Sequence, residues 1–246
     1  PIVGCVASIS DAYVCEMMGK AGFDFILIDT QHSPITVETL QTMMVNISPV
    51  KSPTPILVRV AWNDVRLINQ ALDLGADGII IPWVNTQEEA EQAVASAKFP
   101  PMGSRSWGPR RAIEFYDDLA EYERNANDDV LVLPQIEHVD AVKNLDSILS
   151  VDGVDGIMIG PADLAYSMGY GQDKDNPEVD KMIKRVLTGC QKHDVPFGMF
   201  TGTLTIAQKW LSQGGLIATV GADTGFISEG IEKTRVDVRD LLTKLT

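Results

Sequence analysis

Eight short apolar segments, each followed by a longer segment of helical periodicity, dominate the pattern of this 246-residue sequence. The apolar segments span Ile2–Ala7, Asp24–Ile28, Pro55–Val60, Gly78–Pro82, Val130–Ile136, Gly156–Gly160, Pro196–Phe200 and Leu216–Gly221. They carry Ile, Val and Leu at successive positions, which is typical of parallel strands that are covered on both faces. The pattern therefore predicts eight βα units, the number that closes a (β/α)8 barrel.

Helices are expected between and after these strands. They span Asp11–Ala21, Val37–Ile47, Asp64–Leu74, Gln87–Lys98, Ile113–Asn127, Ala141–Leu149, Pro177–His193, Leu204–Gln213 and Ile227–Leu242. Asp11 and Thr86 fit helix N-caps, and Gly22 and Gly75 follow helices where a C-terminal cap belongs. We predict a single TIM-barrel domain of the α/β class over residues 1–246. An open, doubly wound parallel sheet is the alternative.

Composition limits the partners and the compartment. The formal net charge is −14, from 34 acidic and 20 basic residues, which argues against nucleic acid or an anionic membrane surface as a partner. No apolar stretch approaches the ~20 residues of a membrane span. The three cysteines, Cys5, Cys15 and Cys190, show no metal-binding spacing and are odd in number. We therefore expect a protein of the reducing cytoplasm.

Two carboxylates stand at the ends of neighbouring predicted strands. Glu137 ends the fifth apolar segment, and Asp163 follows the sixth. Because the carboxyl ends of consecutive barrel strands lie side by side, the two side chains are placed to share one dication, and oxygen ligands suit Mg²⁺, Mn²⁺ or Co²⁺. Gln135 has the strand parity of Glu137 and is a candidate donor beside it. The alternative is structural, with Asp163 as a helix N-cap and Glu137 in a first helical turn.

Two further strand ends offer groups for an anionic substrate. Arg59 closes an apolar segment, where a guanidinium is costly unless it pairs with an anion, either a substrate oxygen or a structural carboxylate. Gly160, Pro161, Ala162 and Asp163 open a helix directly after the sixth strand, and helix N-termini bind anions through free N–H groups. A small carboxylate fits there beside the cation.

His32 is the histidine best placed for proton transfer. It follows Asp29 after the second strand, whereas His138 begins one helix and His193 ends another. A histidine that titrates near neutral pH is the usual proton-transfer group. An exposed loop histidine is the alternative. Asp73 ends the third helix, where a surface or turn carboxylate is the ordinary expectation.

Other chemistries lack their signatures. The sequence has no GxGxxG after the first strand, no GxxxxGK[ST] and no GxSxG, so it indicates neither dinucleotide binding, nor a P-loop, nor a serine-hydrolase elbow. No lysine falls at a predicted strand end, which disfavours a Schiff-base aldolase. Segment 99–111, rich in Pro, Gly and Arg, is too long for a minimal connection. We place it on the strand-entry side of the fifth strand and expect it at an interface.

Five motifs together resemble the HpcH/HpaI family of class II pyruvate-dependent aldolases, whose relatives include 2-keto-3-deoxy acid aldolases, 4-hydroxy-2-oxo acid aldolases and macrophomate synthase. The motifs are AGFDFILID at 21–29 with His32, LVR at 57–59 with WND at 62–64, ADGIIIP at 76–82 with Asn85, QIE at 135–137, and IGPADL at 159–164. They occur in this order over nearly the whole chain.

The resemblance implies how a substrate is held. Glu137 and Asp163 match the ligands of the divalent metal in that family. Arg59 matches the arginine that holds the keto oxygen and steadies the enolate. The carboxylate of pyruvate is expected to meet backbone N–H groups around Ala162 and Asp163.

The resemblance also implies how a proton moves. His32 matches the catalytic base, which acts through water, and Asp73 matches the carboxylate that partners it; Asp29 lies in the motif of His32. The family usually has Asp-Gly-Glu-His where this chain has Asp29, Thr30, Gln31 and His32, so a carboxylate beside the histidine is missing. Residues 106–109 also differ from the smaller bacterial version. These departures concern the aldehyde partner more than the enolate chemistry.

The implied reaction is reversible cleavage of 4-hydroxy-2-oxo acids to pyruvate and an aldehyde through a metal-stabilised enolate. A decarboxylase or synthase that acts on oxaloacetate through the same enolate, as macrophomate synthase does, is the alternative. A barrel that only binds small acids is a third hypothesis. Because family members are commonly hexamers, we expect a homo-oligomer, a trimer or a hexamer, with helix 227–242 packed on a neighbouring subunit.

Overall fold

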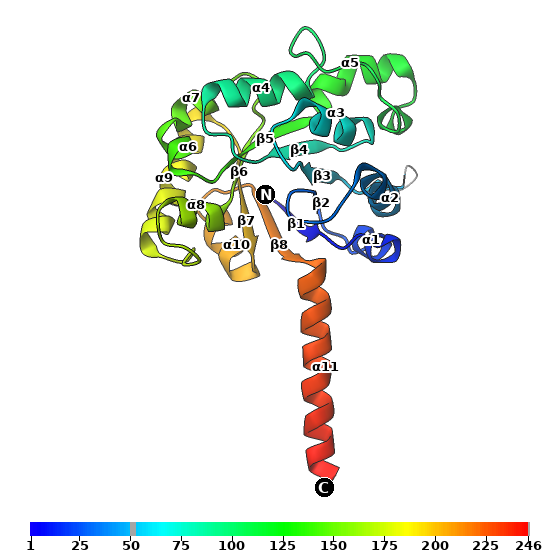
Figure 1. The fold of residues 1–246 in the computed structure, drawn as a ribbon, viewed down its shortest axis with the longest axis vertical. Helices are drawn as coiled ribbons and strands as arrows, with labels where there is room; N and C mark the ends of the chain where they lie inside the picture. Colours follow the sequence, from blue (N-terminus) through cyan, green and yellow to red (C-terminus); the bar gives the residue numbers. More distant parts are fainter. Residues whose placement is uncertain (50–52, 246) are drawn as a thin grey trace.

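The computed structural model describes residues 1–49 and 53–245; residues 50–52 and 246 of the predicted domain lie outside the described residues. Eight parallel strands form a closed barrel in chain order (Figure 1). They are β1 Ile2–Ala7, β2 Phe25–Asp29, β3 Ile56–Arg59, β4 Gly78–Ile81, β5 Leu131–Ile136, β6 Ile157–Ile159, β7 Phe197–Gly202 and β8 Ile217–Ala222. β8 closes the barrel on β1, where Ile2 pairs with Ile217. The predicted (β/α)8 barrel is confirmed, and the open sheet is excluded.

Helices follow the strands and cover most of the barrel. They are α1 Ala12–Gly19, α2 Val37–Ile47, α3 Val65–Asp73, α4 Gln87–Ala97, α5 Leu119–Asp129, α6 Val139–Lys143, α7 Leu145–Leu149, α8 Pro161–Ser167, α9 Pro177–His193, α10 Leu204–Leu211 and α11 Asp223–Leu245. Two predicted helices differ. The helix predicted at 113–127 is a 3-10 turn, η1 Ala112–Phe115, followed by α5, which Asp118 caps. The helix predicted at 141–149 is divided into α6 and α7 at Asn144, whose backbone is not helical.

Side-chain caps decide where the helices after the site-bearing loops begin. Asp64 caps α3 by accepting the backbone N–H groups of Arg66 and Leu67. Thr86 and Glu89 form a reciprocal capping box at the start of α4. Such caps stabilise a helix by about 1 kcal/mol each. They also fix the ends of the loops that follow β3 and β4 at the carboxyl end of the barrel.

The strands bury side chains on both faces. One alternating set fills the inside of the barrel and comprises Phe25, Leu27, Leu57, Ile80, Leu133, Met158 and Ile217. The other set packs against the helices in the main core. Because strand side chains alternate with period two, the inward parity continues past the last apolar layer to Asp29, Arg59, Gln135 and Glu137. Strand geometry alone therefore directs these four polar residues to the barrel mouth.

Segment 99–111 lies at the amino-terminal end of the barrel. The Arg105 side chain, which is 1% exposed, donates to Asp73 at the end of α3 at 2.8 Å, and its guanidinium lies 4.4 Å from the centre of the Phe99 ring. Arg111 donates to the carbonyl of Leu74 at 3.1 Å. Arginines thus fasten the segment to the barrel, and its predicted role at an interface stays a prediction.

The last helix, α11, departs from the barrel pattern. Its first residue, Asp223, is buried and accepts the N–H groups of Ser8 and Ile9, both at 2.7 Å, and the Ser8 hydroxyl at 2.6 Å. After this anchored start the helix extends away from the barrel as a single rod (Figure 1). It begins at Asp223, one turn before the predicted start at Ile227.

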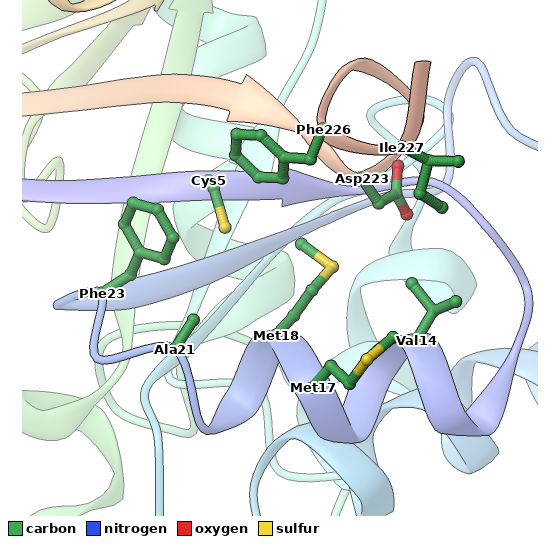
Figure 2. A pocket seen from close by; sticks show the side chains of 9 residues that line it. All are labelled: Cys5, Val14, Met17, Met18, Ala21, Phe23, Asp223, Phe226 and Ile227. Atoms are coloured by element: carbon green, nitrogen blue, oxygen red, sulfur yellow. The ribbon is translucent and has the colours of Figure 1, made fainter. Parts of the chain in front are cut away.

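An apolar pocket of about 350 Å³ opens beside the base of α11 (Figure 2). Met17 and Met18 of α1, Phe23, and Phe226 and Ile227 of α11 are among the residues that line it. In a (β/α)8 barrel the helix after each strand joins the outer ring. Here the helix after β8 points outward, so the chain exposes both an apolar flank and the helix that ordinarily covers it.

Cys5, Cys15 and Cys190 are free and buried. Among the helices of residues 1–49 and 53–245, none combines the length and the apolar character needed to cross a membrane.

Candidate active site

The barrel mouth collects the polar residues that the sequence placed at strand ends. Asp29 and Arg59 are direct partners in the register of β2 and β3. Glu137 follows β5, whose last residue pairs with the last residue of β6. Gly160 and the first turn of α8 follow β6 directly. The mouth therefore contains the guanidinium of Arg59 and three carboxylates, those of Asp29, Glu137 and Asp163.

Glu137 is a buried carboxylate at the mouth, at 1% exposure. Its Oε1 accepts the backbone N–H of Trp83 at 2.8 Å, and its Oε2 accepts the side-chain N–H of Gln135. Burial raises the pKa of Glu137 to about 7; the charge of Asp163 adds to the rise, whereas the two hydrogen bonds oppose it. Near neutral pH such a carboxyl group is stabilised either by a proton or by a nearby cation.

Gly160 allows the first turn of α8 to approach this carboxylate. A Cβ atom at this position would lie 2.7 Å from Gln135 Nε2 and 2.8 Å from Glu137 Oε2. Glycine is needed here for space and not for an unusual backbone angle, since its φ is −97°. The close approach places Asp163 within electrostatic reach of Glu137.

The first turn of α8 combines a carboxylate with backbone donors. Pro161 occupies the first turn, where its missing N–H costs nothing. The N–H groups of Ala162 and Asp163 have no acceptor inside the helix because they belong to its first turn. An anion and a cation could therefore be held side by side at this turn, the anion by the N–H groups and the cation by Asp163.

Asp29 and Arg59 form a bidentate ion pair. Arg59 Nε donates to Asp29 Oδ1 at 2.9 Å and Nη2 to Oδ2 at 2.7 Å, and both side chains are largely buried. The guanidinium also lies 4.7 Å from the centre of the Phe200 ring. The structural alternative for Arg59 is thus realised through Asp29, while Nη1 remains for a ligand.

His32 and Asp73 lie at opposite ends of the barrel. The backbone N–H of His32 donates to Asp29 Oδ1 at 3.4 Å, and the residue is exposed near the mouth. Asp73 ends α3, which returns from the carboxyl end of β3 to the amino end of β4, and there it pairs with Arg105. The predicted partnership of Asp73 with His32 is therefore not formed within one chain. The carboxylate that contacts His32 is Asp29.

The donors at the mouth fit a hard dication. Glu137 and Asp163 offer oxygen ligands, and Gln135 Oε1 is buried without a hydrogen-bond partner among the described residues. Within residues 1–49 and 53–245, no group of three or more His, Cys, Asp or Glu side chains is gathered as a metal cage. A cation on two carboxylates keeps positions for water and for substrate oxygens, which is the usual arrangement for Mg²⁺.

Sequence reasoning did not single out Trp83, although the site depends on it. Its φ is +58°, in the left-handed region, which costs a residue other than glycine roughly 1–2 kcal/mol. This conformation accompanies the turn that directs its N–H onto Glu137. The available signal was its position, since Trp83 follows Pro82 immediately beyond the fourth apolar segment.

Three aromatic side chains stand in a row at the mouth, in the loops after β3, β4 and β5. Ring centres are 6.4 Å apart for Trp62 and Trp83 and 5.9 Å apart for Trp83 and His138. Trp62 is 55% exposed. We call these three residues the aromatic row.

Known proteins share this barrel and its motifs. The profile of the HpcH/HpaI aldolase/citrate lyase family matches residues 3–229. The 4-hydroxy-2-oxo-heptane-1,7-dioate aldolase of Salmonella typhimurium is 38% identical over 94% of this chain and 88% of its own length. An HpcH/HpaI aldolase/citrate lyase family protein of Burkholderia cenocepacia has a TM-score of 0.91 at 30% identity, covering 97% and 95% of the two chains. Macrophomate synthase has a TM-score of 0.89 at 25% identity, covering 100% and 86%. The chain therefore belongs to the HpcH/HpaI aldolase/citrate lyase family, a family of carbon–carbon lyases.

Proposed function

We propose that the protein is a divalent-metal-dependent aldolase that reversibly cleaves 4-hydroxy-2-oxo acids to pyruvate and an aldehyde. The observation that carries the proposal is the buried Glu137 with Asp163 and Arg59 in electrostatic reach, at the mouth of a barrel of this family. The name of the Salmonella relative supports the same reaction class.

The residues of the mouth divide the binding of a 2-oxo acid between them. Glu137 and Asp163 would hold Mg²⁺, Mn²⁺ or Co²⁺, and the bound dication supplies electrophilic stabilisation of the keto oxygen as the enolate forms. Arg59 donates to the same oxygen through Nη1. Removal of one such donor typically raises the activation free energy by a few kcal/mol. The N–H groups of Ala162 and Asp163 hold the carboxylate of the acid.

His32 moves the proton of the reaction. Through a water molecule it takes the proton of the C4 hydroxyl while the C3–C4 bond breaks. The bonding electron pair passes into the enolate, and the aldehyde leaves with the C4 carbonyl. A proton then returns to C3 and gives pyruvate. Asp29 positions both partners, because it binds the guanidinium of Arg59 and the backbone N–H of His32. General base catalysis of this kind contributes roughly 10²–10⁴-fold.

Pyruvate release from 4-hydroxy-2-oxo acids, measured with and without EDTA, tests the proposal. We expect activity to be lost on chelation and restored by Mg²⁺, Mn²⁺ or Co²⁺. A borohydride treatment in the presence of pyruvate serves as the control, because it inactivates only an enzyme that forms an imine with a lysine. Full activity in EDTA together with borohydride inactivation would overturn the metal-dependent reaction.

Decarboxylation of oxaloacetate is the second candidate. The likeness to macrophomate synthase favours it, and the chemistry passes through the same enolate. It needs the dication site and Arg59 but no base for a C4 hydroxyl. The two activities therefore differ in their demand for His32.

We also propose that the protein is a homo-oligomer in which α11 of one chain packs on the barrel flank of another. Five apolar residues recur at helical spacing along α11, and each is at least 43% exposed: Ile227, Ile231, Val238, Leu241 and Leu245. At 1.5 Å per residue the 23-residue helix is about 35 Å long. An isolated rod with an apolar stripe gains stability only when the stripe is covered.

The barrel flank of a second copy is the cover that the chain itself provides. The pocket between α1 and the base of α11 is apolar, and Met17 at its edge is 50% exposed. It lies where the helix after β8 would complete the outer ring. Packing of α11 from another copy would fill this place and bury both apolar surfaces. The resemblance to the family favours a trimer or a hexamer.

A further inference from the structure

We propose that the aromatic row, Trp62, Trp83 and His138, forms the wall against which the aldehyde part of the substrate binds, and that it makes the enzyme favour aldehydes with an aryl or alkyl substituent. The inference rests on the proposed function and goes beyond it by naming the class of the aldehyde.

The row is attached to the reacting centre through Trp83. The backbone N–H of Trp83 donates to Glu137 Oε1 at 2.8 Å. Trp83 therefore contacts one of the two carboxylates that would hold the dication. Its ring lies between those of Trp62 and His138. A 2-oxo acid held at Glu137 and Asp163 therefore has its C4 substituent within reach of these rings.

The chemistry of the row suits an apolar group. Trp62 leaves 55% of its surface exposed at the barrel mouth, and a ligand that covers such a ring gains hydrophobic and ring–ring interactions. The spacings of 5.9 and 6.4 Å are those of interacting aromatic pairs. An aryl group on the aldehyde would extend the row by one more ring.

The charges around the row do not suit a substituent that ends in a carboxylate. Cleavage of a 4-hydroxy-2-oxo-heptane-1,7-dioate, the substrate in the name of the Salmonella relative, leaves an aldehyde with a terminal carboxylate, which calls for a cation to receive it. Arg59 pairs with Asp29 at 2.7 Å, and its remaining Nη1 is assigned to the keto oxygen. Arg66 and Lys143, the next cations in sequence, lie on the solvent-exposed surface and pair with Asp64 at 3.5 Å and with Asp140 at 2.7 Å.

The test compares kcat/KM for 4-hydroxy-2-oxo-4-phenylbutanoate and for 4-hydroxy-2-oxo-heptane-1,7-dioate in each protein. The variant is Trp83→Gly, because glycine accepts the left-handed backbone at this position and keeps the N–H on Glu137. The ratio of the two values cancels any change in metal affinity or folded fraction. The control is Leu216→Ala, an apolar residue that is 44% exposed directly before β8, at the amino-terminal end of the barrel.

We expect the phenyl substrate to be favoured by the wild type, and the ratio to fall roughly tenfold in Trp83→Gly, mainly through KM, with no change in the control. A wild type that favours the dioate, or an unchanged ratio in Trp83→Gly, overturns the inference while the aldolase function stands. A wild type that cleaves neither these substrates nor any other 4-hydroxy-2-oxo acid overturns the proposed function itself.

Discussion

Asp29 shows how one residue can serve two functional groups. Its carboxylate receives the guanidinium fork of Arg59 and also the N–H groups of Gln31 and His32. In the proposed mechanism Arg59 steadies the enolate and His32 moves the proton. The same buried carboxylate thus positions both Arg59 and His32. A displacement of Asp29 would therefore disturb substrate binding and proton transfer together.

Substitution of His32 should separate the two candidate reactions. We expect His32→Asn to slow aldol cleavage at least roughly 10²-fold, because the base of the C4 hydroxyl is lost, while oxaloacetate decarboxylation changes little. Arg59→Lys is the comparison variant. It keeps the charge but loses the fork geometry, so both reactions should slow together. Steady-state kinetics on both substrates measures this. Equal slowing of both reactions by His32→Asn would remove the histidine from the C4 proton transfer.

The pKa of Glu137 predicts a pH dependence of the metal-free protein. The folded-state pKa of about 7 lies above the ordinary 4.5, so the folded state binds this proton more tightly than the unfolded state. Its contribution to the free energy of unfolding is full below about pH 4.5 and is lost as pH rises through about 7. Between pH 5 and pH 8 the loss should amount to roughly 2–3 kcal/mol.

Urea unfolding at several pH values, in EDTA, measures this contribution. Glu137→Gln provides the reference, because the amide does not titrate. The difference in unfolding free energy between wild type and variant should shift by the stated amount between pH 5 and pH 8, and saturating Mn²⁺ should reverse the trend in the wild type. A difference that is independent of pH would show that Glu137 keeps an ordinary pKa.

At the scale of elements, the strands and most of the mouth followed from local pattern. The apolar segments become strands because both of their faces are buried, and the period-two alternation carries Asp29, Arg59 and Glu137 to the mouth. Local pattern could not show whether the end of a helix and a distant loop lie at the same end of the barrel. The resemblance pairs Asp73 with His32, yet within one chain α3 places Asp73 at the end of the barrel opposite His32.

The left-handed backbone of Trp83 could not be foreseen either. A tryptophan gives no local signal for φ above zero, and the contacts of Trp83 with Glu137, Trp62 and His138 come from other parts of the chain. The direction of α11 was equally hidden, because an apolar stripe on a helix looks the same whether it covers its own barrel or that of another copy. Residue patterns thus specified the elements, and long-range contacts decided these three features.

Asp223 is expected to fix the direction in which α11 leaves the barrel. Its carboxylate accepts three hydrogen bonds from Ser8 and Ile9. Asp223→Ala leaves two partly buried N–H groups and the Ser8 hydroxyl without their acceptor, so we expect a loss of about 1–3 kcal/mol in the free energy of unfolding. Asp237→Ala, an exposed position on the same helix, is the control and should change stability by less than about 0.5 kcal/mol. Denaturant unfolding compares the two. Equal stability of both variants would contradict the anchoring role.

At the scale of the whole molecule, the single chain closes its barrel of strands but leaves one place in the outer ring of helices uncovered. Seven strands are followed by helices that pack on the barrel, and the eighth is followed by a rod that projects from it (Figure 1). The uncovered flank and the exposed stripe of α11 complement each other in chemistry. Association of several copies is the arrangement that buries both without changing the fold of any chain.

An acidic residue on the stripe of α11 should break the assembly. Ile231→Asp places a charge among the apolar residues of the stripe, so we expect a smaller species in light scattering coupled to size-exclusion chromatography, at the same protein concentration at which the wild type is a trimer or a hexamer. Lys233→Asp introduces the same residue on the opposite face of the helix and should leave the assembly intact. A monomeric wild type, or dissociation by both variants alike, would contradict packing through this stripe.

The central claim is that Glu137 and Asp163 together hold one dication at the barrel mouth. Anomalous diffraction from crystals soaked with Mn²⁺ and pyruvate tests it most directly. We expect a single peak at the mouth, roughly 2.1 Å from one oxygen of each carboxylate, with pyruvate oxygens completing its coordination. A peak bound elsewhere, or no peak at the mouth while pyruvate is seen there, would contradict the claim.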